Sequence, residues 1–370
     1  MAKHIVFLVH GMGSHFAEGE SAQTPWHVPV VKALDDAWQG FASLQPCPRA
    51  DWIEYVPITY DEVFREYLKG VGDDAARLRG YVQQNAVLND VFKVLEGASA
   101  EEANFFWANI MDVLDYRYGA DHFRDVHVHI AQTIATTVEQ VWRDRPGDNC
   151  TFSVIAHSLG TAAAHGALNR LGGGNIGTSA AFRMGGSFHV HAYVSVANVS
   201  RVLWPDATDI YHDTIVRPGS PLGPGYVDSF LNVRHIADPI PAPLAFAPLD
   251  WGRGFQTLNV QHVRELNLHD FVHYLRNPRV SGAIFRAVAG PMLLPQGDID
   301  AAVAAFPDVA LTDATKRQRV EQLIADFARS LNDVYGHDAA LVTSIPKLLA
   351  LAVRTLWSDR QALGPLLEAA

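Results

Sequence analysis

Residues 151–164 read TFSVIAHSLGTAAA, and this stretch decides the fold class. Its first six residues are β-branched, aromatic or small, a pattern typical of a strand buried inside a sheet. The small residues that follow Gly160 are typical of a helix packed closely on its neighbours. No loop separates the two, and Ser158 lies at their junction. The sequence therefore predicts a strand, a sharp turn that carries a serine, and a helix.

The rest of the first 280 residues alternates strand and helix in the same way. The apolar run IVFLV at 5–9 ends abruptly in His-Gly, as a strand buried on both faces does when it enters a tight turn. The other predicted strands are 52–59, 189–199 and 227–236, and the predicted helices include 28–38 and 123–145. This order predicts an α/β fold with a mostly parallel central sheet flanked by helices.

The length of the chain predicts one large domain with additions. With 370 residues, 48% of them hydrophobic, the chain can bury a single large core. We expect a catalytic domain over 1–280, with a helical, cap-like insertion at 61–120. We expect 281–370 to form a C-terminal helical extension packed on the same domain. The insertion is rich in aromatic residues, which could line an acyl or lipid pocket or form its own core.

The composition excludes several classes of protein. The chain has 29 basic and 40 acidic residues, a net charge of −11, and no basic run that would bind nucleic acid. Its two cysteines, Cys47 and Cys150, are too few for a disulfide framework. The N-terminal residues lack a signal-peptide pattern, and charges and prolines interrupt the later apolar stretches. We expect a cytoplasmic protein with no transmembrane segment, although export without a cleavable signal and the oligomeric state stay open.

The junction at Ser158 fits the nucleophile elbow of serine hydrolases, small-x-Ser-x-Gly. Ala156 takes the first small position and Gly160 the second. Small side chains are needed there because the helix crosses close to the strand, and alanine meets that need. His157 precedes the serine, and we expect it to pack against the site or contact it from behind. At this elbow the chain resembles the lipase and esterase branch of the α/β-hydrolase family.

The turn after the first strand also resembles that family. It reads His10-Gly11-Met12-Gly13, the His-Gly turn that supplies half of the oxyanion hole in these enzymes. The resemblance implies an α/β-hydrolase fold, with the backbone N–H groups of Met12 and Leu159 facing the developing oxyanion. Preorganised donors of this kind contribute roughly 10² to 10³ in rate each.

A serine needs a base to remove its proton and a carboxylate to orient that base. In the α/β-hydrolase fold the chain order is serine, acid, histidine. Asp238, just past a predicted strand, is the expected acid, with Asp206 and Asp209 as rivals; an aspartate before proline is also a common loop residue. The resemblance favours His269 as the base, because related esterases place it shortly before Tyr-Leu and Asn-Pro. His273 is the alternative candidate for the base.

These features together predict a serine hydrolase that cleaves carboxylic esters through an acyl-serine intermediate. The expected substrate is a small-molecule or lipid ester, and the chemistry requires no cofactor and no metal. Two alternatives stay open. An acyltransferase would use the same triad with an alcohol or thiol in place of water, and a binding protein could retain the scaffold without activity.

Two other kinds of site are disfavoured by the sequence. A dinucleotide fingerprint starting in the first glycine turn would place Phe16 where the motif needs a small residue. His127 and His129 lie two apart on a predicted helix and point to different faces. His189 and His191 share one face of a strand, which is compatible with zinc, but the sequence offers no evident Asp, Glu or Cys ligand nearby.

Overall fold

The structure is a computed structural model of the chain. It describes residues 3–11, 25–60, 120–174, 188–203, 211, 213–219, 225–236, 238, 241, 245–249, 251–262 and 269–306. The predicted insertion at 61–120 therefore lies outside the described residues except for its last position, and so does most of the C-terminal extension.

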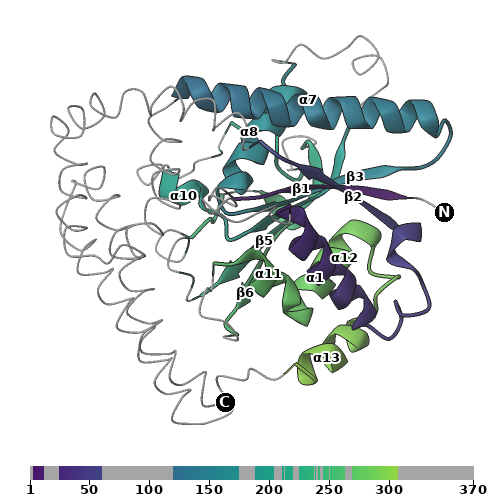
Figure 1. The fold of residues 1–370 in the computed structure, drawn as a ribbon. Helices are drawn as coiled ribbons and strands as arrows, with labels where there is room; N and C mark the ends of the chain where they lie inside the picture. Colours follow the sequence, from purple (N-terminus) through teal and green to yellow (C-terminus); the bar gives the residue numbers. More distant parts are fainter. Residues whose placement is uncertain are drawn as a thin grey trace, which may run out of the picture.

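The described strands form one fully parallel sheet. They are β1 (His4–Val9), β2 (Ile53–Ile58), β3 (Thr151–His157), β4 (Val190–Val196), β5 (Val227–His235) and β6 (Phe255–Val260). Their order in the sheet is β2-β1-β3-β4-β5-β6. Helices cover both faces (Figure 1), so the predicted α/β class with a parallel, helix-flanked sheet is confirmed.

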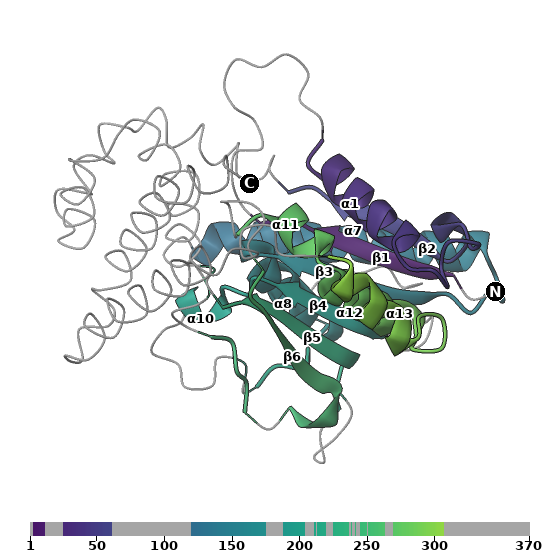
Figure 2. The same cartoon turned by 90° about the horizontal axis from the view of Figure 1, so that it is seen from below.

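Two layers of helices enclose the sheet. One face carries α7 (Ala120–Asp144) and α8 (Leu159–Gly172); the other carries α1 (His27–Gln39), α11 (Phe271–Arg276), α12 (Pro278–Ala289) and α13 (Gln296–Ala304). Figure 2 shows α1 alongside α11 and α12, which it contacts. Helix α1 connects β1 to β2, toward one edge of the sheet, whereas α7 and α8 connect β2 to β3 and β3 to β4, toward the other edge. Because such crossovers are right-handed, the change of direction places α1 on the opposite face from α7 and α8. The short helices are η1 (Arg49–Asp51), α10 (Ser200–Leu203) and η3 (Gly252–Gly254).

The burial of β1 explains its continuous apolar sequence. Phe7 belongs to the core beneath α7 and α8, whereas its neighbours Val6 and Leu8 belong to the core beneath α1 and α12. A strand buried on both faces cannot alternate apolar and polar residues. Burying Phe7 completely stabilises the fold by about 2–3 kcal/mol. On the second face, Trp38 of α1 packs edge-on against Phe285 of α12, with ring centroids 5.2 Å apart.

The topology indicates where a functional site lies. From β1 the chain moves to β2 on one side and later returns to β3 on the other, so the strand order reverses between β1 and β3. In open parallel sheets, ligands bind at such a switch point, outside the carboxyl ends of the strands. His10 follows β1 and Ser158 follows β3 at this edge.

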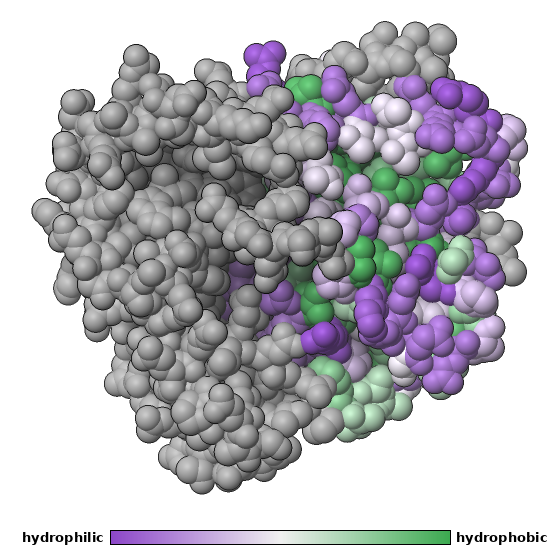
Figure 3. Space-filling view, in the orientation of Figure 1, coloured by the Kyte–Doolittle hydropathy of each residue, from purple (hydrophilic) through white to green (hydrophobic). Residues whose placement is uncertain are grey.

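Some boundaries differ from the expected ones. The sequence pattern did not predict β6, and α8 begins at Leu159, directly after the serine. The domain boundary expected at 280 falls inside α12, which contacts β1, β4 and β5. None of the helices within the described ranges has the length and apolarity to cross a bilayer. The described surface in Figure 3 is a mosaic of hydrophilic and hydrophobic residues.

Candidate active site

Ser158 has a strained backbone conformation. Its φ of 52° and ψ of −129° lie in a region that residues other than glycine rarely adopt, at a cost of about 1–3 kcal/mol. Three hydrogen bonds hold it there. Its N–H donates to Val196 O of β4 at 2.9 Å, and its carbonyl accepts from the backbone N–H and the hydroxyl of Thr161 at 3.0 and 2.6 Å. The surrounding structure thus fixes the sharp turn between β3 and α8.

Small residues allow the turn to pack against the end of β1. A Cβ added to Gly160 would lie 2.1 Å from His10 O, and one added to Gly11 would lie 2.6 Å from Ser158 Cβ. Ala156 is completely buried at the end of β3. Gly160, the second small position of the elbow pattern, is therefore the point where the backbone of α8 meets that of the segment after β1. This contact also brings the His-Gly turn against the serine.

The structure brings together the three residues that the sequence predicted as nucleophile, base and acid. His269 Nε2 lies 2.8 Å from Ser158 Oγ, and His269 Nδ1 lies 3.0 and 2.9 Å from the carboxylate oxygens of Asp238. Asp238 is completely buried, whereas Ser158 and His269 retain 9% and 7% exposure. Because a carboxylate accepts hydrogen bonds, Nδ1–H donates to Asp238 and leaves Nε2 to accept from the serine hydroxyl.

The acid is held by a tyrosine that the sequence did not single out. The Tyr274 hydroxyl donates to Asp238 Oδ2 at 2.7 Å and accepts from the backbone N–H of His235 at 3.1 Å. Burial raises the pKa of Tyr274 well above its usual 10, so the phenol stays protonated as a donor. The Asp238 N–H donates to His235 O at 3.2 Å. These bonds fix the carboxylate that faces His269.

His157 supports the base from the opposite side. Its Nε2 donates to the carbonyl oxygen of His269 at 2.8 Å, and its ring stacks on Phe271 with centroids 4.7 Å apart. The rings of His157 and His269 are 5.1 Å apart. The residue before the serine therefore packs behind the base and holds its backbone in place.

The His-Gly turn is braced by aromatic side chains. His10 stacks on Tyr60 with centroids 4.5 Å apart and lies 4.6 Å from the Trp26 ring. The Tyr60 hydroxyl donates to the His10 carbonyl, the same oxygen that approaches Gly160. Tyr60 follows β2, and no sequence pattern pointed to it. Its contact orients the peptide between His10 and Gly11 beside the serine.

The structure describes half of the predicted oxyanion hole. Leu159 is the first residue of α8, so its N–H is among the donors that a helix leaves without an intrahelical acceptor. Met12 and Gly13 lie outside the described residues, as do the rival acids Asp206 and Asp209.

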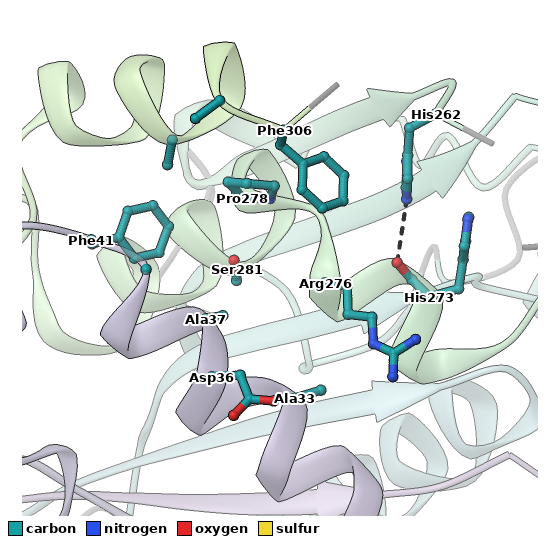
Figure 4. Close-up of a pocket in the computed structure, with 13 residues that line it drawn as sticks. Ala33, Asp36, Ala37, Phe41, His262, His273, Arg276, Pro278, Ser281 and Phe306 are labelled. Atoms are coloured by element: carbon teal, nitrogen blue, oxygen red, sulfur yellow. Dashed lines mark hydrogen bonds between the residues drawn. The ribbon is translucent and has the colours of Figure 1, made fainter. Parts of the chain in front are cut away.

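His273, the reserve base, lies in α11 and faces another part of the molecule. Its ring stacks on His262 with centroids 4.3 Å apart, and both line a cavity of about 580 Å³ together with Arg276 and Phe306. In Figure 4 a hydrogen bond joins the His262 ring to the His273 backbone oxygen, at 3.3 Å. The residue hydrogen-bonded to Ser158 is His269.

His189 and His191 have a carboxylate partner that the sequence did not reveal. His189 Nε2 and His191 Nδ1 lie 2.5 and 3.1 Å from the two oxygens of Asp228, which belongs to the neighbouring strand β5. At these distances both histidine rings hydrogen-bond to the same carboxylate. Within the ranges that the structure describes, no group of three or more His, Cys, Asp or Glu residues is arranged to hold a metal ion.

Comparisons with known proteins do not assign a family. No family model and no curated protein matches the chain. One matching solved structure is the crystal structure of an uncharacterized protein from Pseudomonas aeruginosa, which is 12% identical and has a TM-score of 0.32. The match covers 94% of this chain and 52% of that one, so this chain spans about half its length. A TM-score this low does not establish a shared fold.

Proposed function

We propose that this chain is a serine hydrolase of the α/β-hydrolase fold that cleaves carboxylic esters. The observation that carries the proposal is the hydrogen-bonded series of Ser158, His269 and Asp238, with the serine on a strained turn. Removing an alcohol proton requires a base within hydrogen-bond reach, and the 2.8 Å separation of His269 Nε2 and Ser158 Oγ meets this requirement. The buried carboxylate holds the base in the required tautomer.

The positions of the three residues in the fold support the same proposal. Ser158 lies between β3 and α8, Asp238 follows β5, and His269 follows β6. The chain order serine, acid, histidine is that of α/β-hydrolases, and so is a nucleophile on a sharp turn where a strand of the sheet meets a helix. A catalytically inactive protein that only binds a ligand would not require a strained serine paired with a base.

The chemistry follows from the geometry. His269 accepts the Ser158 proton while Oγ attacks the ester carbonyl, and the resulting imidazolium is stabilised by Asp238. The Leu159 N–H, and by the family resemblance the Met12 N–H, would donate to the oxyanion. His269 then protonates the departing alcohol. In the second half-reaction it activates a water molecule that releases the acid from the acyl-serine.

The first experiment is labelling with a fluorophosphonate, which reacts with serines activated by a base. We expect one modified peptide that contains Ser158, and no labelling of Ser158→Ala. Ser153→Ala is a matched control, because Ser153 is also buried but lies within β3, near the strand's N-terminal end. If folded wild-type protein stays unlabelled, or if Ser158→Ala is still labelled at the same rate, the proposal is wrong.

A second experiment separates hydrolysis from acyl transfer. The purified protein would be given p-nitrophenyl esters of increasing chain length, with and without an added acceptor alcohol. Release of the free acid as the main product supports a hydrolase. If the acyl group appears mainly on the acceptor at low acceptor concentration, the enzyme is an acyltransferase using the same triad.

A further inference from the structure

A second cavity lies away from the three proposed catalytic residues. It is a groove of about 710 Å³ between strands β5 and β6 and helices α12 and α13. This volume is within the range of small-molecule sites, roughly 300–1,000 Å³. Ser158, Asp238 and His269 do not line it. Whatever occupies this groove is therefore not in contact with the reacting atoms.

Part of the groove lining is apolar. Leu231 and Leu258 contribute to it from the strands, and Ala287, Ile299 and Val303 from the helices. Four of these five are large aliphatic residues, and Leu258 and Val303 are only partly buried. Covering such a surface with a hydrocarbon chain is favourable, because apolar area is removed from water.

Three arginines also line the groove. Arg279 and Arg286 lie seven residues apart on α12, hence on one helix face, and Arg253 lies in η3 just before β6. In the described ranges, no hydrogen bond or ion pair engages the guanidinium of Arg253 or Arg279. Arg286 donates to the neutral side-chain oxygen of Gln296. None of the three positive charges is therefore neutralised by a described carboxylate.

The charge of the groove is opposite to that of the chain. The protein carries 40 acidic and 29 basic residues, yet the lining has three arginines and one carboxylate, Asp300, which accepts from Gln296. Guanidinium groups pair with carboxylates and phosphates through two parallel hydrogen bonds. We propose that this groove binds a single-chain anionic amphiphile, with its oxyanion head on the arginines and its alkyl chain on the aliphatic residues.

An extended acidic peptide fits the groove less well. A peptide that adds to a sheet pairs with the backbone edge of the outermost strand. The groove instead lies over side chains of β5 and β6 and beneath α12 and α13. The occupant must therefore be slender enough to lie between a sheet face and two helices, as an alkyl chain is.

The test is isothermal titration calorimetry of the full chain at low ionic strength, with dodecanoate, dodecyl phosphate and dodecanol, each below its micelle concentration or solubility limit. The test variant is Arg253→Gln/Arg286→Gln, and the matched control is Arg124→Gln/Arg143→Gln, which makes the same charge change on α7 across the sheet. We expect the anions to bind the wild type and the control alike, and the test variant to bind about tenfold or more weakly. Thermal melts establish that all variants are folded.

Either head group supports the proposal, and the tighter one identifies the ligand as a carboxylate or a phosphate. Three results would overturn it: equal binding of dodecanol and dodecanoate, unchanged affinity in the test variant, or no anion binding by the wild type. A diazirine derivative of dodecanoate should label peptides of β6 or α12, and labelling confined to other peptides would count against the groove. Because Ser158→Ala should bind the anions normally, this proposal and the proposed hydrolase activity can fail independently.

Discussion

The substitution Gly160→Ala tests whether the close approach of α8 to β1 sets the geometry of the site. The added Cβ would lie 2.1 Å from His10 O, 2.8 Å from His10 C and 3.0 Å from Val9 O. All three are backbone atoms, so no side chain can rotate to make room. The backbones must separate by about 1 Å, and overpacking of this kind costs about 1–3 kcal/mol of stability.

The same separation should reduce activity more than stability. It would move Ser158 and the Leu159 N–H relative to the His-Gly turn, and lengthen the 2.8 Å contact between Ser158 Oγ and His269 Nε2. A misplacement of about 1 Å can cost roughly 10² in rate. We therefore expect Gly160→Ala to lower kcat/KM, and the rate of fluorophosphonate labelling, by about 10²-fold in a protein that still folds.

Urea unfolding, ester hydrolysis and labelling would be measured on the same preparations. Gly297→Ala is the matched control, because a Cβ at Gly297 meets no atom within 4 Å and the residue lies in α13. We expect the control to match the wild type or to gain up to about 1 kcal/mol of stability. If Gly160→Ala unfolds and labels like Gly297→Ala, the contact with β1 does not position the serine.

Two further predictions concern buried polar groups. Tyr274→Phe removes the donor to Asp238 and leaves the His235 N–H without its acceptor, so urea unfolding should show a loss of about 1.5–3 kcal/mol and assays a lower kcat/KM. Activity equal to wild type would mean that Tyr274 does not position the acid. Burial lowers the pKa of His165 to about 3, so below pH 6.5 the unfolded chain binds a proton that the folded chain does not. The free energy of unfolding therefore decreases as the pH falls through 6.5, by about 1.6 kcal/mol between pH 6.5 and 5. Urea titrations at pH 6.5 and pH 5 would measure the free energy of unfolding. Between these pH values His165→Gln should lose correspondingly less of it than the wild type, and an equal loss would contradict the lowered pKa assigned to His165.

The sequence predicted the local features of the site well because each depends on neighbours in the chain. The strand, the turn at Ser158 and the helix after it are encoded within residues 151–172, and the burial of β1 can be inferred from its unbroken apolar run. The choice of His269 over His273 depended on a family resemblance. Spacing alone could not decide it, because only the folded chain determines which ring reaches the serine.

Other features could not be predicted because they arise from contacts between distant segments. Tyr274 acquires its role from Asp238, 36 residues away, and Tyr60 from His10, 50 residues away. The sequence pattern did not predict β6, which is the outermost of the described strands on its side of the sheet. Gln256, Thr257 and Asn259 are exposed there, so the strand lacks a regular alternation of apolar residues. Asp228 joins His189 and His191 only through the pairing of β4 with β5.

The place of β1 between β2 and β3 has a consequence for how the protein is made. Its partner on one side is β3, which pairs His4 with Thr151 across 147 residues of sequence. At a translation rate of roughly 5–20 residues per second, β1 waits about 7–30 s on the ribosome before that partner is synthesised. During this time one side of a strand with five consecutive apolar residues (5–9) is unpaired, the state in which nascent chains aggregate. We therefore expect the yield of soluble protein to rise when synthesis is slowed by low temperature or assisted by chaperones that bind extended apolar segments.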